Sequence, residues 1–250
     1  MFAEERKSKI LEIIKSDNSV RVSELSKLFN VSEATIRRDL IELEQAGCIV
    51  RTHGGAVSTN STNFEPSFKE KQDKFLKEKE QIAKKAASLI EDGDTVTIDS
   101  GTTTQFISRY ITAKGVTVVT NSVNLADELS DREDIEVIVT GGILRTKTKA
   151  MVGPLAEEIL KQLKVDKLFL GANGVSIKSG VTTPNIVEAS TKRAMIEGAK
   201  EVYLVVDSSK FDEVNFSLIC NVSRIDYIIT DKLPKDYEKY EHLGVKFILA

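Results

Sequence analysis

The change in apolar periodicity along the chain constrains its fold more than any other feature. From Thr95 onward, short runs rich in β-branched residues alternate with stretches whose apolar residues recur at helical spacing. Such alternation is typical of a mainly parallel sheet with helices on both faces, so we expect a Rossmann-like α/β domain here. The predicted strands are Thr95–Asp99, Val116–Thr120, Ile135–Thr140, Lys167–Leu170, Val202–Val206, Tyr227–Thr230 and Lys246–Leu249, with a helix at Ile186–Glu197.

The N-terminal part of the chain has a different pattern, which is helical over residues 2–46. After a first helix, a second is predicted over Glu24–Phe29, because Ser23 is a favourable N-cap residue. We expect Leu25 and Leu28 of this helix to point inward. The pattern indicates a small helical domain ahead of the α/β domain.

A tight turn is predicted between the second helix and the third. Asn30 tolerates the left-handed backbone conformation, and Ser32 can cap the helix that follows it, Glu33–Ala46. Two helices joined by a three-residue turn are the layout of a helix-turn-helix.

The third helix is predicted to expose a face suited to DNA. Ile36, Leu40 and Leu43 share one side of this helix, and at about 100° per residue Arg37 and Arg38 are carried to the opposite side. Arginine suits bidentate contact with guanine or phosphate, and small neighbouring side chains allow close approach to the groove. The expected DNA contacts on this helix are Ser32, Ala34, Thr35, Arg37 and Arg38. The alternative is a structural three-helix module, in which the arginines pair with Glu33, Asp39 or Glu42.

A short hairpin is predicted after the third helix. Residues 48–57 form two short apolar runs around Gly54-Gly55, which is typical of a β-wing. Arg51 and His53 fall on one side of this wing and are further expected contacts to phosphate or the minor groove. The N-terminal domain is therefore predicted to be a small α+β winged helix-turn-helix.

A polar seam separates the two patterns. The segment Val57–Ser67 is composed of small and polar residues with a proline near its end, a composition that cannot bury enough surface to fold alone. We predict a DNA-binding domain at 1–57, a linker at 58–73 and an α/β domain at 74–250. The charged stretch Phe68–Glu80 is interpreted as the solvated face of the helix that opens the second domain.

The predicted strands of the α/β domain end in small polar residues. In open parallel sheets, ligands bind just beyond the carboxyl ends of the strands. The Ser-Gly-Thr-Thr-Thr run after the first strand offers backbone N–H groups and three hydroxyl groups, and Lys210 adds a positive charge, so a phosphate fits better than a neutral sugar. The expected ligand-binding residues are Asp99, Ser100, Gly101, Thr102, Thr103, Thr104, Asn121, Ser122, Gly141, Gly142, Gly171, Asn173, Gly174 and Lys210.

Both parts resemble one known family. The string Val31–Leu40, together with Leu43-Glu44, Gly47 and Arg51–Ala56, resembles the DNA-binding signature of the DeoR family of bacterial regulators. Asn30 stands where that family usually has Gly. The strand-end motifs between Glu78 and Asp231 resemble the sensor domain of the same family, which is similar to ribose-5-phosphate isomerase. The resemblance implies a DNA-binding repressor of a carbohydrate-use operon, relieved by a phosphorylated sugar; fructose 1-phosphate and galactitol, tagatose or inositol derivatives are comparable candidates.

Composition limits the remaining classes of function. The 35 basic and 38 acidic side chains leave a net charge of −3, so DNA affinity depends on where the charges lie. Cys48 and Cys220 lack metal-ligand spacing and are expected to be reduced structural thiols, with no metal or cofactor. No signal peptide or membrane helix is recognisable, so a cytoplasmic protein without a membrane partner is expected.

An enzyme is the alternative that the α/β domain leaves open. An aldose-ketose isomerase needs a carboxylate base, and isomerases of the resembled fold carry acidic residues where this chain has Asn173 and Gly174. Glu188 and Asp99 are possible substitutes, but we expect no catalytic residues. We expect instead a homo-oligomer, a dimer or tetramer, that spaces two winged helices on double-stranded operator DNA.

Overall fold

The computed structural model describes residues 2–17, 19–46, 48–52, 54–58, 65 and 67–250. The chain divides into two compact units, Met1–Pro66 and Ser67–Ala250, and each is considered by itself. Within the described ranges, no helix has both the length and the apolar character that crossing a membrane requires.

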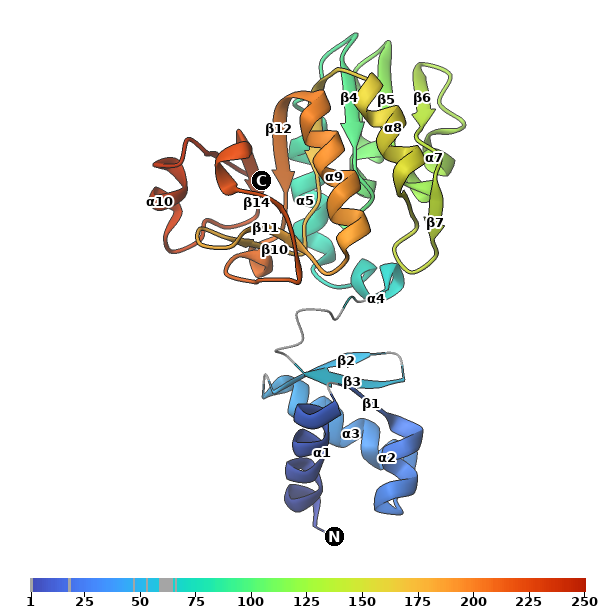
Figure 1. Ribbon diagram of the computed structural model, residues 1–250, viewed down its shortest axis with the longest axis vertical. Helices are drawn as coiled ribbons and strands as arrows, with labels where there is room; N and C mark the ends of the chain where they lie inside the picture. The colour runs from blue at the N-terminus through green and yellow to red at the C-terminus, as the bar shows by residue number, and fades with distance from the viewer. Residues whose placement is uncertain (1, 18, 47, 53, 59–64, 66) are drawn as a thin grey trace. The chain divides into compact units, whose positions relative to one another are not determined.

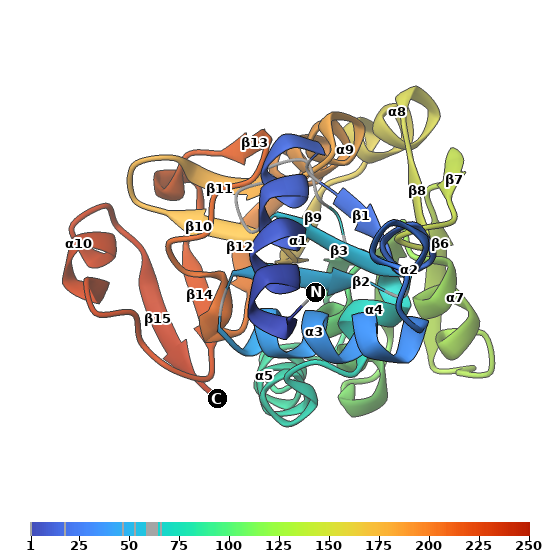
Figure 2. The same cartoon turned by 90° about the horizontal axis from the view of Figure 1, so that it is seen from below.

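The first unit packs three helices against a three-stranded antiparallel sheet (Figures 1 and 2). Its elements are α1 (Ala3–Asp17), β1 (Ser19–Arg21), α2 (Val22–Phe29), α3 (Glu33–Gln45), β2 (Ile49–Thr52) and β3 (Gly55–Ser58), and the strand order is β1-β3-β2. The core between the helices and the sheet consists mainly of buried Ile, Leu and Val side chains. The arrangement is the predicted winged helix-turn-helix.

The start of α2 differs from the prediction. The helix begins at Val22, directly after β1, and its N-cap position is held by Arg21 without a side-chain hydrogen bond, so Ser23 is not the N-cap. The backbone N–H of Val22 instead donates to the carbonyl of Gly54 in the wing, at 2.7 Å. The expectation that Leu28 points inward is also wrong, since it is 64% exposed.

The turn and the third helix agree with the prediction. Asn30 adopts the left-handed conformation (φ 51°, ψ 49°), and the side chain of Ser32 accepts the backbone N–H of Thr35 at 3.2 Å. Helix α3 ends at Gln45, one residue before the predicted end, and its apolar residues Ile36, Leu40 and Leu43 are buried. The inward side of α3 is therefore the expected one.

The second unit is built on a seven-stranded parallel sheet (Figure 1). Its strands, in the order β15-β14-β12-β9-β4-β5-β6, are β15 (Lys246–Leu249), β14 (Tyr227–Thr230), β12 (Ala199–Val205), β9 (Val165–Leu170), β4 (Thr95–Ile98), β5 (Val116–Thr120) and β6 (Ile135–Val139). Along the chain, β5 and β6 are added on one side of β4, and β9, β12, β14 and β15 are then added on its other side. The order of the strands therefore reverses between β4 and β9. This is a topological switch point, the place where open α/β sheets bind ligands.

Helices cover both faces of this sheet. The helical elements are α4 (Phe68–Gln72), α5 (Leu76–Ala87), α6 (Thr102–Gln105), η1 (Phe106–Tyr110), α7 (Val123–Leu129), α8 (Pro154–Gln162), α9 (Ile186–Gly198), η2 (Ser208–Lys210), η3 (Val222–Arg224) and α10 (Tyr237–Glu241). Side chains of β9 alternate between the two cores: Phe169 packs with α5, η1 and α7, whereas Leu168 and Leu170 pack with α8 and α9. Both faces of the strand are buried, as expected for a parallel sheet.

Two small antiparallel sheets flank the main one and were not predicted. One is the hairpin of β7 (Ile143–Arg145) and β8 (Ala150–Val152), and the other contains β10 (Gly174–Ser176), β11 (Gly180–Thr183) and β13 (Ser217–Cys220). Their strands have three or four residues each, which is too short for a periodic signal. Both follow the carboxyl end of a parallel strand, β6 or β9, and so contribute to the surroundings of the predicted site.

The predicted linker and charge run also differ from the structure. Residues 68–72 of the predicted linker form α4, which belongs to the second unit and buries Phe68. The helical conformation is interrupted before α5, where the backbone of Phe75 is left-handed (φ 54°). The charged stretch is not simply a solvated face, because Lys79 is buried.

Candidate functional site

The exposed side of α3 carries the predicted DNA contacts. Ala34, Arg37 and Arg38 are exposed and Thr35 is half-buried, all on the side opposite the buried Ile36. Arg51 lies on the wing strand β2 with its guanidinium 3.9 Å from Glu44. His53 lies outside the described residues. The structure thus brings the α3 residues together on one surface.

The acidic residues near α3 are held mainly by α1. Asp39 is buried and accepts two hydrogen bonds from the Arg6 guanidinium, at 2.5 and 2.9 Å. Glu42 accepts from Lys7 at 2.9 Å. These pairs fasten α1 to α3, and they engage two of the three acidic residues with which the arginines of a purely structural module could pair.

The two arginines differ in their own partners. Arg37 pairs with Glu33 one turn earlier at 2.6 Å, in an exposed ion pair. Such surface pairs contribute little free energy and exchange readily for another anion. Arg38 has no side-chain partner among the described residues, which leaves its five N–H donors to solvent or to DNA.

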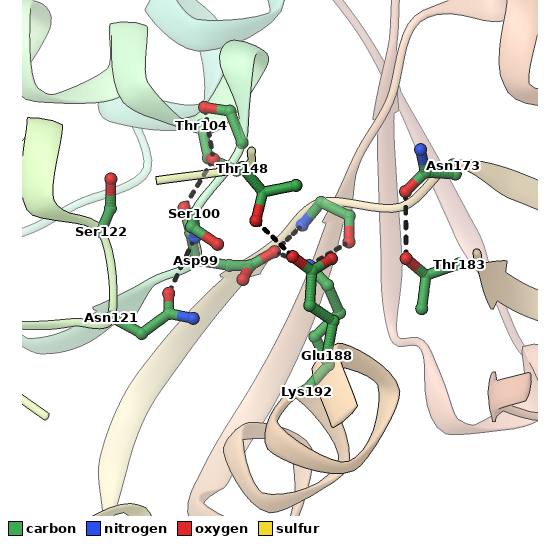
Figure 3. A network of polar contacts seen from close by, with 12 residues as sticks. Asp99, Ser100, Thr104, Asn121, Ser122, Thr148, Asn173, Thr183, Glu188 and Lys192 are labelled. Atoms are coloured by element: carbon green, nitrogen blue, oxygen red, sulfur yellow. Dashed lines mark hydrogen bonds and ion pairs between the residues drawn. The ribbon is translucent and has the colours of Figure 1, made fainter. Parts of the chain in front are cut away.

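The second predicted site lies at the switch point of the sheet (Figure 3). Asp99, at the end of β4, is fully buried, and its Oδ2 accepts from the Lys192 ammonium and from the Gly171 N–H at 3.0 Å. Lys192 also donates to the Gly171 carbonyl at 3.0 Å. Burial raises the pKa of Asp99 and outweighs the opposing effect of Lys192. The other carboxylate oxygen, Oδ1, is buried and has no hydrogen-bond partner among the described residues.

A second ion pair lies beside the first. Glu188 accepts from the Thr148 hydroxyl at 2.5 Å (Figure 3). It also pairs with Arg145 of β7 at 2.5 Å. Burial by itself raises the pKa of Glu188, but the charges of Lys192 and Arg145 and the Thr148 hydrogen bond together leave it lowered. Helix α9 therefore presents one carboxylate and one ammonium, four residues apart, toward the end of β4.

Several predicted residues hold the loops of this site together. The Asn121 side chain accepts the Ser100 N–H at 2.9 Å and donates to the Met151 carbonyl at 3.2 Å. Ser122 caps α7. The Thr104 hydroxyl donates to the Asp99 carbonyl at 2.6 Å, so it is not the free donor that the sequence suggested. These side chains therefore stabilise the loops that surround the site.

The glycines and Asn173 have similar supporting contacts. Gly141 and Gly142 adopt positive φ, and a Cβ at Gly142 would lie 2.8 Å from a backbone oxygen. A Cβ at Gly174 would lie 2.3 Å from the Glu213 carbonyl oxygen. Asn173 accepts from the Thr183 hydroxyl at 3.1 Å, which leaves the amide NH₂ group of Asn173 without a described partner.

The remaining predicted residues have fewer contacts with other parts of the chain. Thr102 and Thr103 follow Gly101 in the short helix α6, and their hydroxyl groups have no partner in the described part of the chain. Lys210 follows β12, is partly exposed and donates to Ser209 at 3.2 Å. The ends of β4, β9 and β12 lie side by side in the sheet, so the structure brings these residues to one edge.

Four charged or polar residues of this region were missed as site residues: Lys79, Arg145, Thr148 and Lys192. Lys192 has a readable signal, since Glu188 and Lys192 are at i and i+4 and lie on the same side of the helix as Met195, which is buried. Arg145 and Thr148 have none, because they belong to the unpredicted hairpin.

In the described part of the chain, no cluster of three His, Cys, Asp or Glu residues could hold a metal ion. Both cysteines are free; Cys48 is exposed, whereas burial raises the pKa of Cys220 to about 12.

Comparisons with known proteins match both units of the chain to domains of one family. Residues 6–62 match the model of the DeoR-like helix-turn-helix domain, and residues 74–232 match the DeoR C-terminal sensor domain. The HTH-type transcriptional regulator GlpR of Haloferax volcanii is 43% identical, over 99% of this chain and 98% of its own length. The lactose phosphotransferase system repressor of Staphylococcus epidermidis is 37% identical, over 96% and 95%. A solved ribose 5-phosphate isomerase A from Methanocaldococcus jannaschii is 19% identical over 53% of each chain, with a TM-score of 0.39.

Proposed function

Because the chain belongs to the DeoR family of transcriptional regulators, we propose that it represses a carbohydrate-use operon and that a phosphorylated sugar relieves the repression. Membership of the family makes it a DNA-binding regulator. The similarity to a relative named as a lactose phosphotransferase system repressor favours repression over activation and a sugar-linked signal.

The proposed DNA contacts are those predicted on α3 and the wing. The observation that carries this proposal is the exposed Arg38, whose neighbouring acidic residues are already paired with α1. Arg37 can exchange its Glu33 partner for a phosphate or a guanine edge, and Arg51 can do so from the wing. Ser32, Ala34 and Thr35 would allow the helix to approach the groove.

The proposed effector site is the edge formed by the ends of β4, β9 and β12. Thr102 and Thr103 have free hydroxyl donors, and Lys210 supplies a positive charge for a phosphate. The unpaired Oδ1 of Asp99 can accept a hydrogen bond from a sugar hydroxyl. This combination of anion donors and one buried acceptor is the reason to propose a phosphorylated sugar and not inorganic phosphate alone.

We propose binding without catalysis at this site. An isomerase needs a carboxylate that is free to take a proton from carbon. Glu188 is hydrogen-bonded to Thr148 and ion-paired with Arg145, and Asp99 is ion-paired with Lys192 through Oδ2. Only Oδ1 of Asp99 is left, and a sugar hydroxyl is its proposed partner. A measurable rate of proton exchange on sugar phosphates, at ordinary enzyme rates, would contradict this part of the proposal.

A homo-oligomer is proposed on the basis of an exposed apolar surface. Ile143 of β7 is 66% exposed and Leu155 of α8 is 68% exposed, and Ile143 lies beside Gly153 at the start of α8. Ile159, one turn after Leu155 on α8, is 38% exposed and extends the same surface. A second copy is the proposed occupant, because a helix-turn-helix regulator binds two operator half-sites as a dimer.

The central experiment is an operator-binding titration with candidate sugar phosphates. We expect one of them to raise the melting temperature of the full chain and to weaken its complex with operator DNA. Replacing Thr102 and Thr103 with Leu should abolish this response while leaving operator binding intact. If a sugar phosphate binds but operator affinity never changes, the proposed coupling is wrong.

A further inference from the structure

Lys79 is a buried cation without a carboxylate partner in the described part of the chain. It lies in the first turn of α5 and is 4% exposed. Its ammonium donates to the backbone carbonyl oxygen of Lys71, which is the one polar contact that the described residues give it. A lysine ammonium has three N–H donors, so two remain without an acceptor. Because burying an incompletely paired cation costs free energy, an anion bound next to Lys79 would stabilise it.

The charges around Lys79 place it beside the proposed effector site. Four charged groups influence it: Asp207, Lys210, Lys71 and Asp73. Burial, together with Lys210 and Lys71, lowers the pKa of Lys79 to about 8, while Asp207 and Asp73 oppose the change. Asp207 makes no ion pair with Lys79 among the described residues. Its Oδ1 accepts the Ser209 N–H at 3.1 Å, and its Oδ2 lies 4.0 Å from the Lys210 ammonium, so Asp207 offsets the charge of Lys79 only from a distance.

The topology brings Lys79 and Lys210 to the same edge of the sheet. Helix α5 packs against α6, which follows the end of β4, whereas Lys210 follows the end of β12. Strands β4 and β12 flank β9, so their ends are about 10 Å apart. Two lysine side chains on flexible four-carbon stems can approach one phosphate across such a gap.

The contact of Lys79 with Lys71 connects this edge to α4. Helix α4 is the first element of the second unit and follows the segment that leads from the DNA-binding unit. The N-terminus of α4 is held by the Phe68 N–H, which donates to the Lys147 carbonyl at 2.8 Å, and its C-terminus is held by Lys79. Phe75, in the strained left-handed conformation, joins α4 to α5 and is a natural hinge.

We propose that Lys79 bridges the bound phosphate and the C-terminal carbonyl of α4, so that effector binding fixes α4 on the second unit. The inference rests on the proposed effector site and adds to it the residue that carries the signal. A phosphate would occupy the two free N–H donors and keep the ammonium charged, which strengthens its charge-assisted bond to Lys71. Helix α4 would thereby be held more firmly next to the segment that leads to the DNA-binding unit.

The test compares two lysines of the same helix. Lys79→Met replaces the buried ammonium with an apolar chain of similar length, and Lys85→Met makes the same change at an exposed position. Binding of inorganic phosphate and of sugar phosphates to the full chain is measured by calorimetry at pH 7. We expect Lys79→Met to weaken binding about tenfold or more and Lys85→Met to leave it within about twofold.

The second readout is hydrogen exchange of the amides of residues 68–75 with and without saturating phosphate. Exchange should slow on binding in the unaltered chain and in Lys85→Met, and stay unchanged in Lys79→Met. Lys79→Arg, which keeps the cation, should retain phosphate binding and separates loss of charge from loss of fold.

Equal phosphate affinity in Lys79→Met and Lys85→Met would overturn this inference while leaving the proposed effector site intact. Unchanged exchange of α4 in the unaltered chain at saturating phosphate would do the same. Failure of the unaltered chain to bind any phosphate compound would overturn both proposals together.

Discussion

Arg37 and Arg38 are neighbours in sequence but have different partners. Arg37 is paired with Glu33 on the surface of α3, whereas the acids that could have held Arg38 are bonded to α1. In the proposed complex, Arg38 would reach DNA without breaking an ion pair, whereas Arg37 would first give up a weak one.

Replacing these arginines is expected to weaken operator binding unequally. Arg38→Ala should cost about 1 to 3 kcal/mol if the side chain contacts a base, and Arg37→Ala should cost less because its ion pair with Glu33 is lost on binding. A side chain that contacts phosphate should instead lower the salt dependence of the affinity by about one ion. Fluorescence anisotropy at several salt concentrations measures both quantities, with the exposed Lys178→Ala as control. If both arginine variants bind like the control, α3 is not the recognition helix.

Phosphate affinity is expected to fall as the pH rises through about 8. The pKa of Lys79 is lowered to about 8 by burial and by Lys210 and Lys71, against Asp207 and Asp73, and the bridge requires the charged ammonium. The ligand in this titration is a sugar phosphate, because a phosphate monoester has its second pKa near 6 and its charge is therefore nearly constant above pH 7.5. Calorimetric titration from pH 7.5 to 9.5 should show the loss of affinity in the unaltered chain, and Lys79→Met should not show it.

The ionisation of Lys79 also makes the free energy of unfolding depend on pH. The unfolded chain binds this proton up to the ordinary lysine pKa of about 10.4, whereas the folded chain releases it near pH 8. Between these values the unfolded state holds more protons, so the contribution of Lys79 to the free energy of unfolding increases with pH.

At the scale of elements, the turn between α2 and α3 sets the direction of α3, the proposed recognition helix. The left-handed Asn30 ends α2, its N–H donates to the Lys27 carbonyl at 3.3 Å, and Ser32 then starts α3. Asn is one of the few residues other than Gly that adopts this conformation at small cost. The resembled family usually has Gly here, which serves the same backbone geometry.

Substitution at Asn30 is expected to act through this backbone conformation alone. Asn30→Gly should keep or slightly raise the stability of the first unit, whereas Asn30→Val should lower it by about 1 to 2 kcal/mol, because a β-branched residue is strained at φ 51°. Hydrogen exchange of α2 and α3 amides as a function of urea measures the change. A Val variant as stable as the Gly variant would show that the turn rearranges.

At the scale of the whole molecule, the two units differ in their cores and in their charged surfaces. The first has a small core and a helix that exposes Arg37 and Arg38, and the second has two cores on a parallel sheet with paired charges at one edge. A regulator must couple them and must also bring two recognition helices to one operator. The exposed apolar surface of β7 and α8 is where we expect copies of the chain to meet.

Charging that surface is expected to separate the copies. Leu155→Glu should reduce the molar mass measured by light scattering and weaken operator binding, because one recognition helix alone contacts only one half-site. Leu243→Glu places the same charge at a leucine that is 41% exposed and should change neither quantity. An unchanged molar mass for Leu155→Glu would move the interface elsewhere.

The pattern of the sequence was sufficient for much of this protein. Period-2 and period-3.6 apolar spacing gave the seven parallel strands to within three residues at each end, the inward side of α3 and the turn at Asn30. These features are local: each depends on neighbours within a turn or a strand, so a linear pattern records them. The carboxyl ends of the strands followed from the same reading, because parallel strands end at one edge.

The identity of the groups that meet at that edge was decided by the tertiary structure. Asp99 and Lys192 are 93 positions apart, and neither residue type announces its partner. Lys79 shares the buried side of α5 with Ile82 and Ala86, at spacings of three and four, yet its charge suggested the solvated side. For Leu28 the prediction was wrong in the opposite direction, because its apolar side chain suggested burial and the packing of α2 leaves it exposed. A side chain is buried or paired according to what lies across the fold, and that information is absent from the spacing of residues along the chain.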